Sequence, residues 1–257
     1  MRIRGHHGWS RMPYANSGPT KRFEEKPFMQ NSRRIIITAL MLLFSSTAFT
    51  ANKVLPPPNL NQAQKLIFYK DHLKGVTKGS RLDYEFKSTT KGADSFTDKI
   101  EIKVTDVVSE RKRDLEFNFL TGAHHIDFTP AKGYTGNPVI IHFLERDISV
   151  MARDTGGSNG YFRNRIRQSF QQPTEMRDVK FNYQGKQLNG TEVVVTPFAK
   201  DPNIDKFQLY AHKRYEFIFS DQIPGGVYRI HTQVPSEDGK STYIDEEMTF
   251  QQITPAA

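Results

Sequence analysis

Two hydrophobic periods alternate along this chain. Through most of its length, apolar residues recur at every second position, the period of a strand with one buried and one solvated face. The segments with this alternation are 82–87, 100–105, 115–119 with Ile126 and Phe128, 179–195, 215–219, 227–234 and 243–253. Turn residues separate them, as at Lys91–Asp94 and Pro224–Gly226. This pattern predicts a long antiparallel sheet.

A helical period interrupts the strands once, between about residues 138 and 171. Ile140, Leu144, Ile148 and Met151 fall on one helical stripe, and Asn137-Pro138 suits a helix start. Gly156-Gly157 ends this helix. A second helix is predicted from residue 159 or 160 to 171, with Phe162, Ile166 and Phe170 spaced by four. A buried strand at 139–144 is the alternative for the first helix.

A shorter helix is predicted near the start of the folded part, over residues 61–74, with Gly75 as its stop. No repeat or linker divides residues 61–257, so we expect a single domain there. The predicted fold is α+β: a long antiparallel sheet that can curl, a short N-terminal helix, and an inserted helical hairpin at about 138–171.

The first sixty residues predict export. Ile35–Phe44 is the one long apolar run, and its ten residues are too few for a membrane-spanning helix, which needs ~20. Arg33 and Arg34 precede it and small residues follow it, which is typical of a secretory signal peptide over residues 29–50. Cleavage is expected near residues 48–51. Ser32–Ile37 also partly matches a twin-arginine signal, so both export routes stay open.

The sequence also predicts the nature of the segments on either side of this signal peptide. Met29 would be a start of normal signal length, which makes residues 1–28 an unstructured upstream stretch from a misassigned start. Residues 51–60 form a stiff lead-in because of Pro56–Pro58. We therefore expect an extracytoplasmic protein, periplasmic or secreted, with no transmembrane span in its mature part.

Removal of residues 1–50 with the signal peptide would also change the net charge. The chain has 36 Lys+Arg and 28 Asp+Glu, of which residues 1–50 hold eight and two, leaving 28 bases, 26 acids and a net charge of +2. This near-neutral balance argues against a nucleic-acid partner. The chain contains no cysteine, which excludes disulfides, thiolate metal sites and a catalytic thiol.

The broadest functional signal is a set of aromatic residues at predicted inward strand positions: Tyr84, Phe86, Phe117, Phe119, Phe128, Phe181, Tyr183, Tyr215, Phe217 and Phe219. The inserted helices either cover these rings as a filled core or act as a lid over an apolar cavity. In the second case Tyr84, Phe117, Phe181 and Phe217 are the predicted ligand contacts.

Two arginines of the second helix could contact a ligand's headgroup. Arg163 and Arg167 share one face at i, i+4 and could hold an anionic group or an acidic partner, although such a face is commonly just solvated.

Catalytic and metal signals are weak. Gly156–Gly160 matches G-x-S-x-G, which would make Ser158 a nucleophile, but no βαβ pattern surrounds it, and a loop between two helices in which Ser158 or Asn159 caps the second helix explains it better. His125 and Asp127 share a strand face and could form an open two-ligand metal site. No nucleotide or phosphate motif occurs, so no cofactor is expected.

The order of these elements resembles the general plan of exported carriers of lipids or lipoproteins. That resemblance implies a non-catalytic binding protein for an apolar or amphipathic ligand, such as a lipid carrier or chaperone. The alternatives are an envelope or secreted protein–protein interaction module with a solid core, and a serine hydrolase using Ser158.

Overall fold

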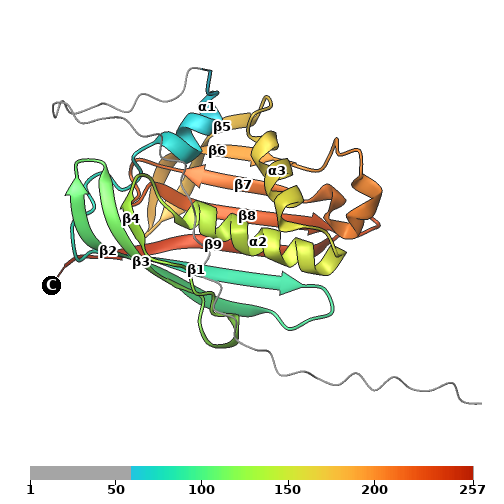
Figure 1. The fold of residues 1–257 in the computed structure, drawn as a ribbon, viewed down its shortest axis with the longest axis horizontal. Coiled ribbons are helices and arrows are strands. Elements are labelled where there is room, and N and C mark those ends of the chain that lie inside the picture. The colour runs from blue at the N-terminus through green and yellow to red at the C-terminus, as the bar shows by residue number, and fades with distance from the viewer. Residues whose placement is uncertain (1–58, 257) are drawn as a thin grey trace, which may run out of the picture. The chain divides into compact units, whose positions relative to one another are not determined.

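The computed structural model describes residues 59–256 (Figure 1). The predicted upstream stretch 1–28, the predicted signal peptide 29–50 and nearly all of the predicted lead-in 51–60 lie outside the described residues.

Within residues 59–256, nine strands form one antiparallel sheet in the order β4-β3-β2-β1-β9-β8-β7-β6-β5. The strands are β1 (Arg81–Thr90), β2 (Phe96–Ser109), β3 (Lys112–Phe119), β4 (Ala131–Tyr134), β5 (Glu175–Tyr183), β6 (Lys186–Val195), β7 (Arg214–Phe219), β8 (Val227–Pro235) and β9 (Thr242–Thr254). Two meanders, β1–β4 and β5–β9, are joined where the first strand pairs with the last. The sheet is open, with β4 and β5 as its edges.

The period-two pattern produces two different faces. On β1, Leu82, Tyr84 and Phe86 are buried and point to the side that the helices cover, which we call the inner face. Arg81 and Asp83 point to the opposite side, the outer face.

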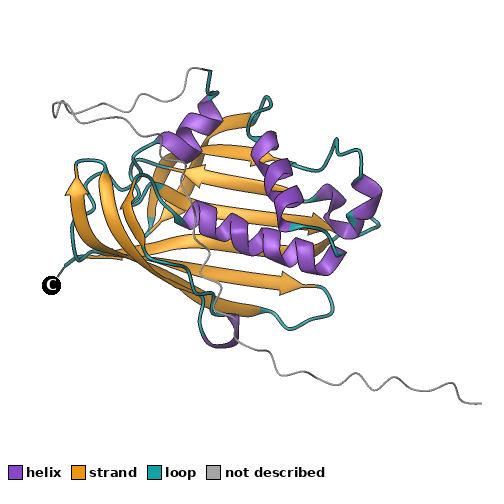
Figure 2. Cartoon of the chain, viewed as in Figure 1, coloured by secondary structure: helices purple, strands orange, loops and turns teal. Residues whose placement is uncertain are grey.

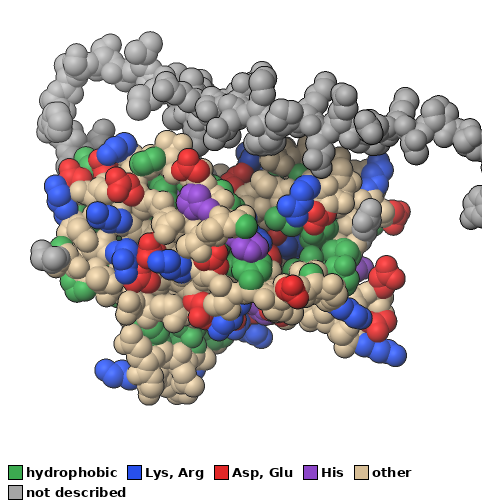
Figure 3. Space-filling model, turned by 90° about the horizontal axis from the view of Figure 1, so that it is seen from below, with side chains coloured by type: hydrophobic (Ala, Val, Ile, Leu, Met, Phe, Trp, Pro, Cys, Tyr) green, Lys and Arg blue, Asp and Glu red, His purple; other side chains and the backbone are tan. Residues whose placement is uncertain are grey.

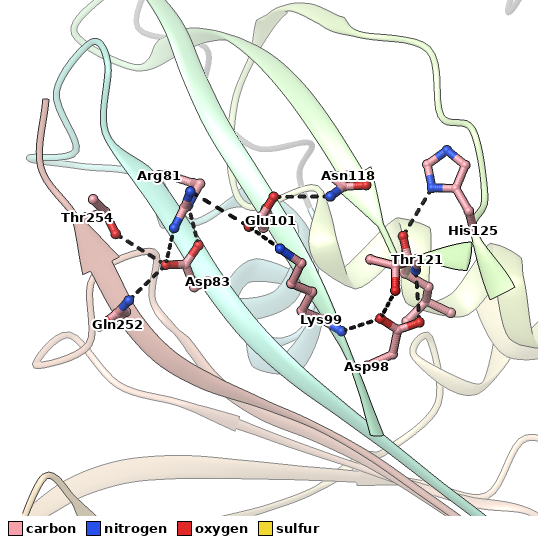
Figure 4. A network of polar contacts seen from close by, with 11 residues as sticks. Arg81, Asp83, Asp98, Lys99, Glu101, Asn118, Thr121, His125, Gln252 and Thr254 are labelled. Carbon is pink, nitrogen blue, oxygen red and sulfur yellow. Dashed lines mark hydrogen bonds and ion pairs between the residues drawn. The ribbon is translucent and has the colours of Figure 1, made fainter. Parts of the chain in front are cut away.

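The outer face is held by hydrogen bonds and ion pairs between neighbouring strands (Figure 4). Asn118 Nδ2 on β3 donates to Glu101 Oε2 on β2 over 3.1 Å, and Gln252 Nε2 on β9 donates to Asp83 Oδ2 on β1 over 3.2 Å. Each half-exposed pair contributes little stability. The inner face therefore carries the stabilising burial.

Three α-helices accompany the sheet: α1 (Gln62–Gln64), α2 (Val139–Thr155) and α3 (Asn159–Ser169). α1 continues as one π-helical turn over Lys65–Tyr69, and short 3₁₀ turns occupy Gly122–His124, Ile204–Lys206 and Gln208–His212. None of the helices in the described part is long and apolar enough to cross a membrane.

The predicted α+β fold, with its long antiparallel sheet, short N-terminal helix and inserted helical pair, is confirmed. α2 is a helix and not the alternative strand, since Asn137 Oδ1 accepts the Val139 N–H at its start and Gly156 ends it with a φ of 68°. The N-terminal helix is shorter than predicted. It ends at Tyr69, after which His72 and Leu73 turn into the core, so burial outweighs local helix propensity.

On the β3 side, one local prediction was wrong and one strand was missed. Ile126 and Phe128 do not continue a strand, because only one isolated bridge joins Phe119 to Ile126, and the chain there is a loop. The short strand β4 was not predicted. It pairs with β3 at only two positions, too few to show an alternating pattern.

The topology explains why helices cover the inner face. The chain leaves the sheet at the β4 edge and returns at the opposite edge, β5, with α2 and α3 between them. The connection must cross one face of the sheet. Figure 2 shows α2 and α3 lying across that face.

The start of α2 is fixed to the sheet by a buried asparagine. Asn137 Nδ2 donates to Tyr84 Oη on β1 and to the Gly225 carbonyl in the turn before β8, each over 2.8 Å. One side chain thus connects the helix start, the first strand and a turn that is 88 residues away in sequence.

The middle of α2 is fixed by two buried ion pairs. Lys213 Nζ lies 2.5 Å from Asp147 Oδ1, and both side chains are fully buried. Tyr215 Oη on β7 donates to the other oxygen of Asp147. Beside this pair, Arg146 contacts Glu246 of β9 over 2.8 Å.

The charges of this cluster balance. Burial alone would raise the pKa of Glu246, but the positive charges of Arg146 and Lys213 hold it below its ordinary value. Ser88 Oγ also donates to Glu246. Two cations and two anions are therefore buried together. Removing any one of them would leave its partner as an unpaired buried charge.

We expect Asp147→Asn to lower the free energy of unfolding by about 3–5 kcal/mol, because Lys213 would stay buried without its counter-ion. Replacing the group together, as Asp147→Leu, Lys213→Met and Tyr215→Phe, should recover most of that loss. Urea unfolding followed by circular dichroism measures both.

The matched control is Arg153→Gln, which removes an exposed cation of the same helix and should change the unfolding free energy by less than about 1 kcal/mol. An Asp147→Asn variant within that range of the wild type would contradict the anchoring role.

Candidate functional site

The predicted aromatic contacts Tyr84, Phe117 and Phe217 do lie on the inner face. Tyr84 and Phe217 are fully buried, and Phe117 is half-buried near the β4 edge. Helix side chains pack onto this face, chiefly from α2 and α3: Ile140, Phe143, Ile148, Met151, Phe162, Ile166 and Phe170. In this structure the aromatic face is a filled core.

Phe181 lies on the other side of the sheet. Met176 of β5 pairs with Val193, and Val193 pairs with Phe217, so these residues share the inner face. Phe181 is an odd number of residues from Met176 and therefore faces outward. There it stacks on Tyr228 with ring centroids 4.0 Å apart. The predicted ten rings thus divide between two faces.

An open cleft lies where the helices leave the inner face uncovered. It has a volume of about 550 Å³ and is bounded by the turn after α1, by β5 and β6, and by the end of β7. Its apolar lining includes Leu66 and Phe219. Its polar lining includes Lys70, Asp178, Lys180, Asn189, Thr191 and Asp221.

The charges around this cleft are of both signs. Lys70 Nζ lies 2.6 Å from Asp221 Oδ1, and Asp221 is largely exposed. Asp178 and Lys180 are two residues apart on β5 and share its inner side. The cleft can therefore offer both a cation and an anion to a polar group, next to apolar side chains.

A row of aromatic rings connects the cleft with the space beneath α3. Phe219 borders the cleft and stacks on Phe217 at 6.3 Å between centroids. Phe217 packs against Phe170 at the end of α3, with ring centroids 5.7 Å apart. Phe170 in turn packs against Phe68, with ring centroids 5.3 Å apart. These contacts are apolar, so another apolar group could replace either partner.

The arginines of α3 make ionic contacts outside the sheet. Arg163 forms two hydrogen bonds with Glu145 of α2, at 2.7 and 2.5 Å, and Arg165 pairs with Asp201 in the loop before β7. Arg167 bonds only to Asn164 within its own helix, over 3.1 Å. Of the predicted pair Arg163 and Arg167, Arg167 is the side chain with no carboxylate partner among residues 59–256.

Ser158 has the geometry of a helix cap. Its Oγ accepts the Tyr161 N–H over 3.2 Å, and its backbone is extended at the start of α3. Within the described part of the chain, no histidine or carboxylate forms a hydrogen bond with this hydroxyl. The G-x-S-x-G match lies between two helices, not on a strand-to-helix turn.

His125 and Asp127 are exposed in the loop after β3. His125 Nδ1 lies 3.1 Å from the Leu120 carbonyl. Among residues 59–256, no three histidine or acidic side chains are grouped closely enough to hold a metal ion.

Sequence reasoning missed His142, which seals the inner face at the β4 margin. Its ring stacks on Phe128 at 3.9 Å with an interplanar angle of 3°, and it meets Phe117 edge-on at 4.3 Å. Burial lowers the pKa of His142 to about 4. Its spacing on α2 resembled an ordinary polar position, so only the fold reveals this contact.

A second histidine is buried behind the cleft. His72 stacks on Phe219 with centroids 5.5 Å apart, and burial lowers its pKa to about 4. A side chain at Gly226 would clash with this ring, since its Cβ would lie 2.8 Å from it. Both histidines are therefore held in the neutral form at neutral pH.

The chain matches no known family model, and no curated protein sequence matches it. Among solved structures, it is similar to lipoprotein LppX from Mycobacterium tuberculosis, with 9% identity, a TM-score of 0.29, and coverage of 70% of this chain and 88% of that one. It is also similar to a LolA superfamily protein from Nitrosomonas europaea, with 7% identity, a TM-score of 0.24, and coverage of 76% and 94%. With TM-scores this low, neither likeness assigns a function to this chain.

We expect the free energy of unfolding to decrease as the pH falls from about 6.5 to 4. In this range the histidines of the unfolded chain become protonated, whereas the buried rings of His72 and His142 stay neutral in the folded protein. Each histidine should contribute on the order of 2 kcal/mol to this loss. His142→Phe keeps the stack on Phe128 and should reduce the loss by that amount. Urea unfolding at both ends of this range measures it, and equal losses in wild type and variant would contradict the assignment.

Proposed function

We propose that this protein is an exported, non-catalytic binding protein for an apolar or amphipathic ligand, such as a lipid. The ligand's polar group would occupy the cleft of about 550 Å³, and its apolar part would extend beneath α3. Export rests on the signal-peptide pattern of residues 29–50.

The observation that carries this proposal is the aromatic row Phe219–Phe217–Phe170, which leads from the open cleft to the underside of α3. Ligand pockets of this kind combine a mostly apolar wall with a few polar groups that orient the ligand. Lys70 and Lys180 would contact an anionic group, while Phe217 would contact hydrocarbon.

The helical cover offers a way to admit such a ligand. Moving α2 would strand the buried charges of Asp147 and Lys213, which is costly. Moving α3 off the sheet, together with the loop that carries its buried ionic partner Asp201, would instead exchange the Phe170–Phe217 contact for a contact with the ligand. We therefore propose that α3 is the movable part of the cover and that α2 stays in place.

The alternative is a protein–protein interaction module with a solid core. The close packing of helix side chains onto most of the inner face favours it. The two proposals differ in whether the purified protein carries a bound small molecule.

We expect the protein purified from its natural host to retain an extra mass in the lipid range under native mass spectrometry. It should also bind the apolar dye N-phenyl-1-naphthylamine. A protein without bound mass and without dye binding would contradict the carrier function and favour the interaction module.

A cross-link between two introduced cysteines tests the movement of α3. The chain has no cysteine of its own, so the cross-linker reacts only with the introduced pair. Glu145→Cys with Arg163→Cys, joined by a bis-maleimide, ties α3 to α2 at an existing contact. Dye binding should fall about tenfold or more relative to the same variant capped with N-ethylmaleimide. Equal binding by both would contradict the opening of α3.

A further inference from the structure

Exposed apolar side chains gather at the tip of one hairpin. Val107 and Val108 on β2 are 40% and 54% exposed, and Tyr69, at 38%, is tied to the same place. Its carbonyl accepts a hydrogen bond from Arg111 Nη2 over 3.0 Å. We call residues 106–112 the hairpin tip.

The tip extends past the body of the sheet. The last paired position between β1 and β2 is Arg81 with Lys103, so β2 and β3 continue without β1 beside them (Figure 1). Register shifts flank Val107 on both sides, between Val104 and Asp106 and again before Ser109. Such bulges turn side chains away from their regular alternation, which leaves both valines at the surface.

A buried arginine holds the tip in this shape. Arg113 is 5% exposed and donates hydrogen bonds to five backbone carbonyls. These carbonyls belong to Leu73, Val76, Ser109, Glu110 and Lys112. The guanidinium therefore joins the tip to the segment after α1, and the valines project from a fixed base.

Basic side chains outnumber acidic ones around these apolar side chains, with Glu110 in the tip and Asp71 close to Lys74 and Arg111 as acidic neighbours. Lys78 pairs with Asp106 over 3.2 Å. Within residues 59–256, four further cations near the tip have no carboxylate within 4 Å: Lys74, Lys103, Arg111 and Lys112. Figure 3 shows one face of the molecule, on which basic and acidic side chains are interspersed.

We propose that the hairpin tip, together with Tyr69, docks on a lipid bilayer that carries anionic headgroups. Val107 and Val108 enter the interfacial layer, and the surrounding lysines and arginine contact lipid phosphates. This proposal does not depend on the identity of any bound ligand, because the tip lies outside the residues that line the cleft.

A bilayer fits the tip better than a second protein surface does. A stable protein–protein interface buries about 1,200–2,000 Å² in total, which two valines and one tyrosine cannot supply. Interfacial attachment needs only a few apolar side chains and a set of cations.

Vesicle binding tests the proposal with the processed protein, exported by and purified from its host. Binding to phosphatidylcholine vesicles containing about one third phosphatidylglycerol should weaken about tenfold for Val107→Ser with Val108→Ser. Arg111→Gln with Lys112→Gln should also weaken it about tenfold and reduce its dependence on salt. Unchanged urea midpoints would verify that both double variants stay folded.

A fluorescent reporter localises the contact. The one tryptophan of the sequence, Trp9, lies upstream of the expected cleavage site, so the processed protein carries only an introduced tryptophan. A tryptophan introduced at position 108 (Val108→Trp) should shift its emission to the blue when vesicles are added. The matched control is Ile141→Trp, at the exposed apolar position of α2, which should not shift.

Three results would overturn the proposal. They are an unshifted Val108→Trp reporter, an equal shift of the Ile141→Trp control, and unchanged binding of the valine variant. A concentration-dependent dimer without vesicles, abolished by Val107→Ser with Val108→Ser, would also overturn it and show that a second copy covers the tip.

Discussion

The buried charge cluster beneath α2 is the interaction on which the arrangement of the protein depends. The chain must cross from the β4 edge to the β5 edge, and only a connection fixed to the inner face keeps the apolar strand positions covered. Asp147 and Arg146 provide that attachment by pairing with Lys213 before β7 and with Glu246 on β9. Because removal of any one charge leaves another unpaired in the core, the position of α2 is specified and not merely favoured.

The two helices that cover the inner face are therefore attached to the sheet by different kinds of interaction. α2 is joined to the strands by ions and by the hydrogen bonds of Asn137, whereas the ionic contacts of α3 go to α2 and to the loop before β7. What α3 shares with the sheet is apolar, including Phe170 on Phe217. An apolar ligand can compete for such contacts but cannot replace a buried ion pair. This difference gives a filled core a way to act as a binding site.

The sequence predicted the elements well and their long-range relations poorly. Alternation along β1 or β9 reports burial on one face directly, and the 3.6-residue period of α2 does the same for a helix. Alternation does not say which face of the sheet a given strand presents, and for that reason Phe181 was assigned to the wrong side: its face follows from pairing through Val193 to Phe217. The charge cluster and the stack of His142 on Phe128 unite residues distant in sequence, so no local pattern could reveal them.

Hydrogen–deuterium exchange on the native protein, resolved by peptide, tests the central claim most directly. If α2 is anchored and α3 is the releasable part of the cover, the amides of Asn159–Ser169 should exchange at least about tenfold faster than those in the middle of Val139–Thr155. Equal protection of both helices, or faster exchange in α2, would contradict it and leave the inner face as a permanently closed core.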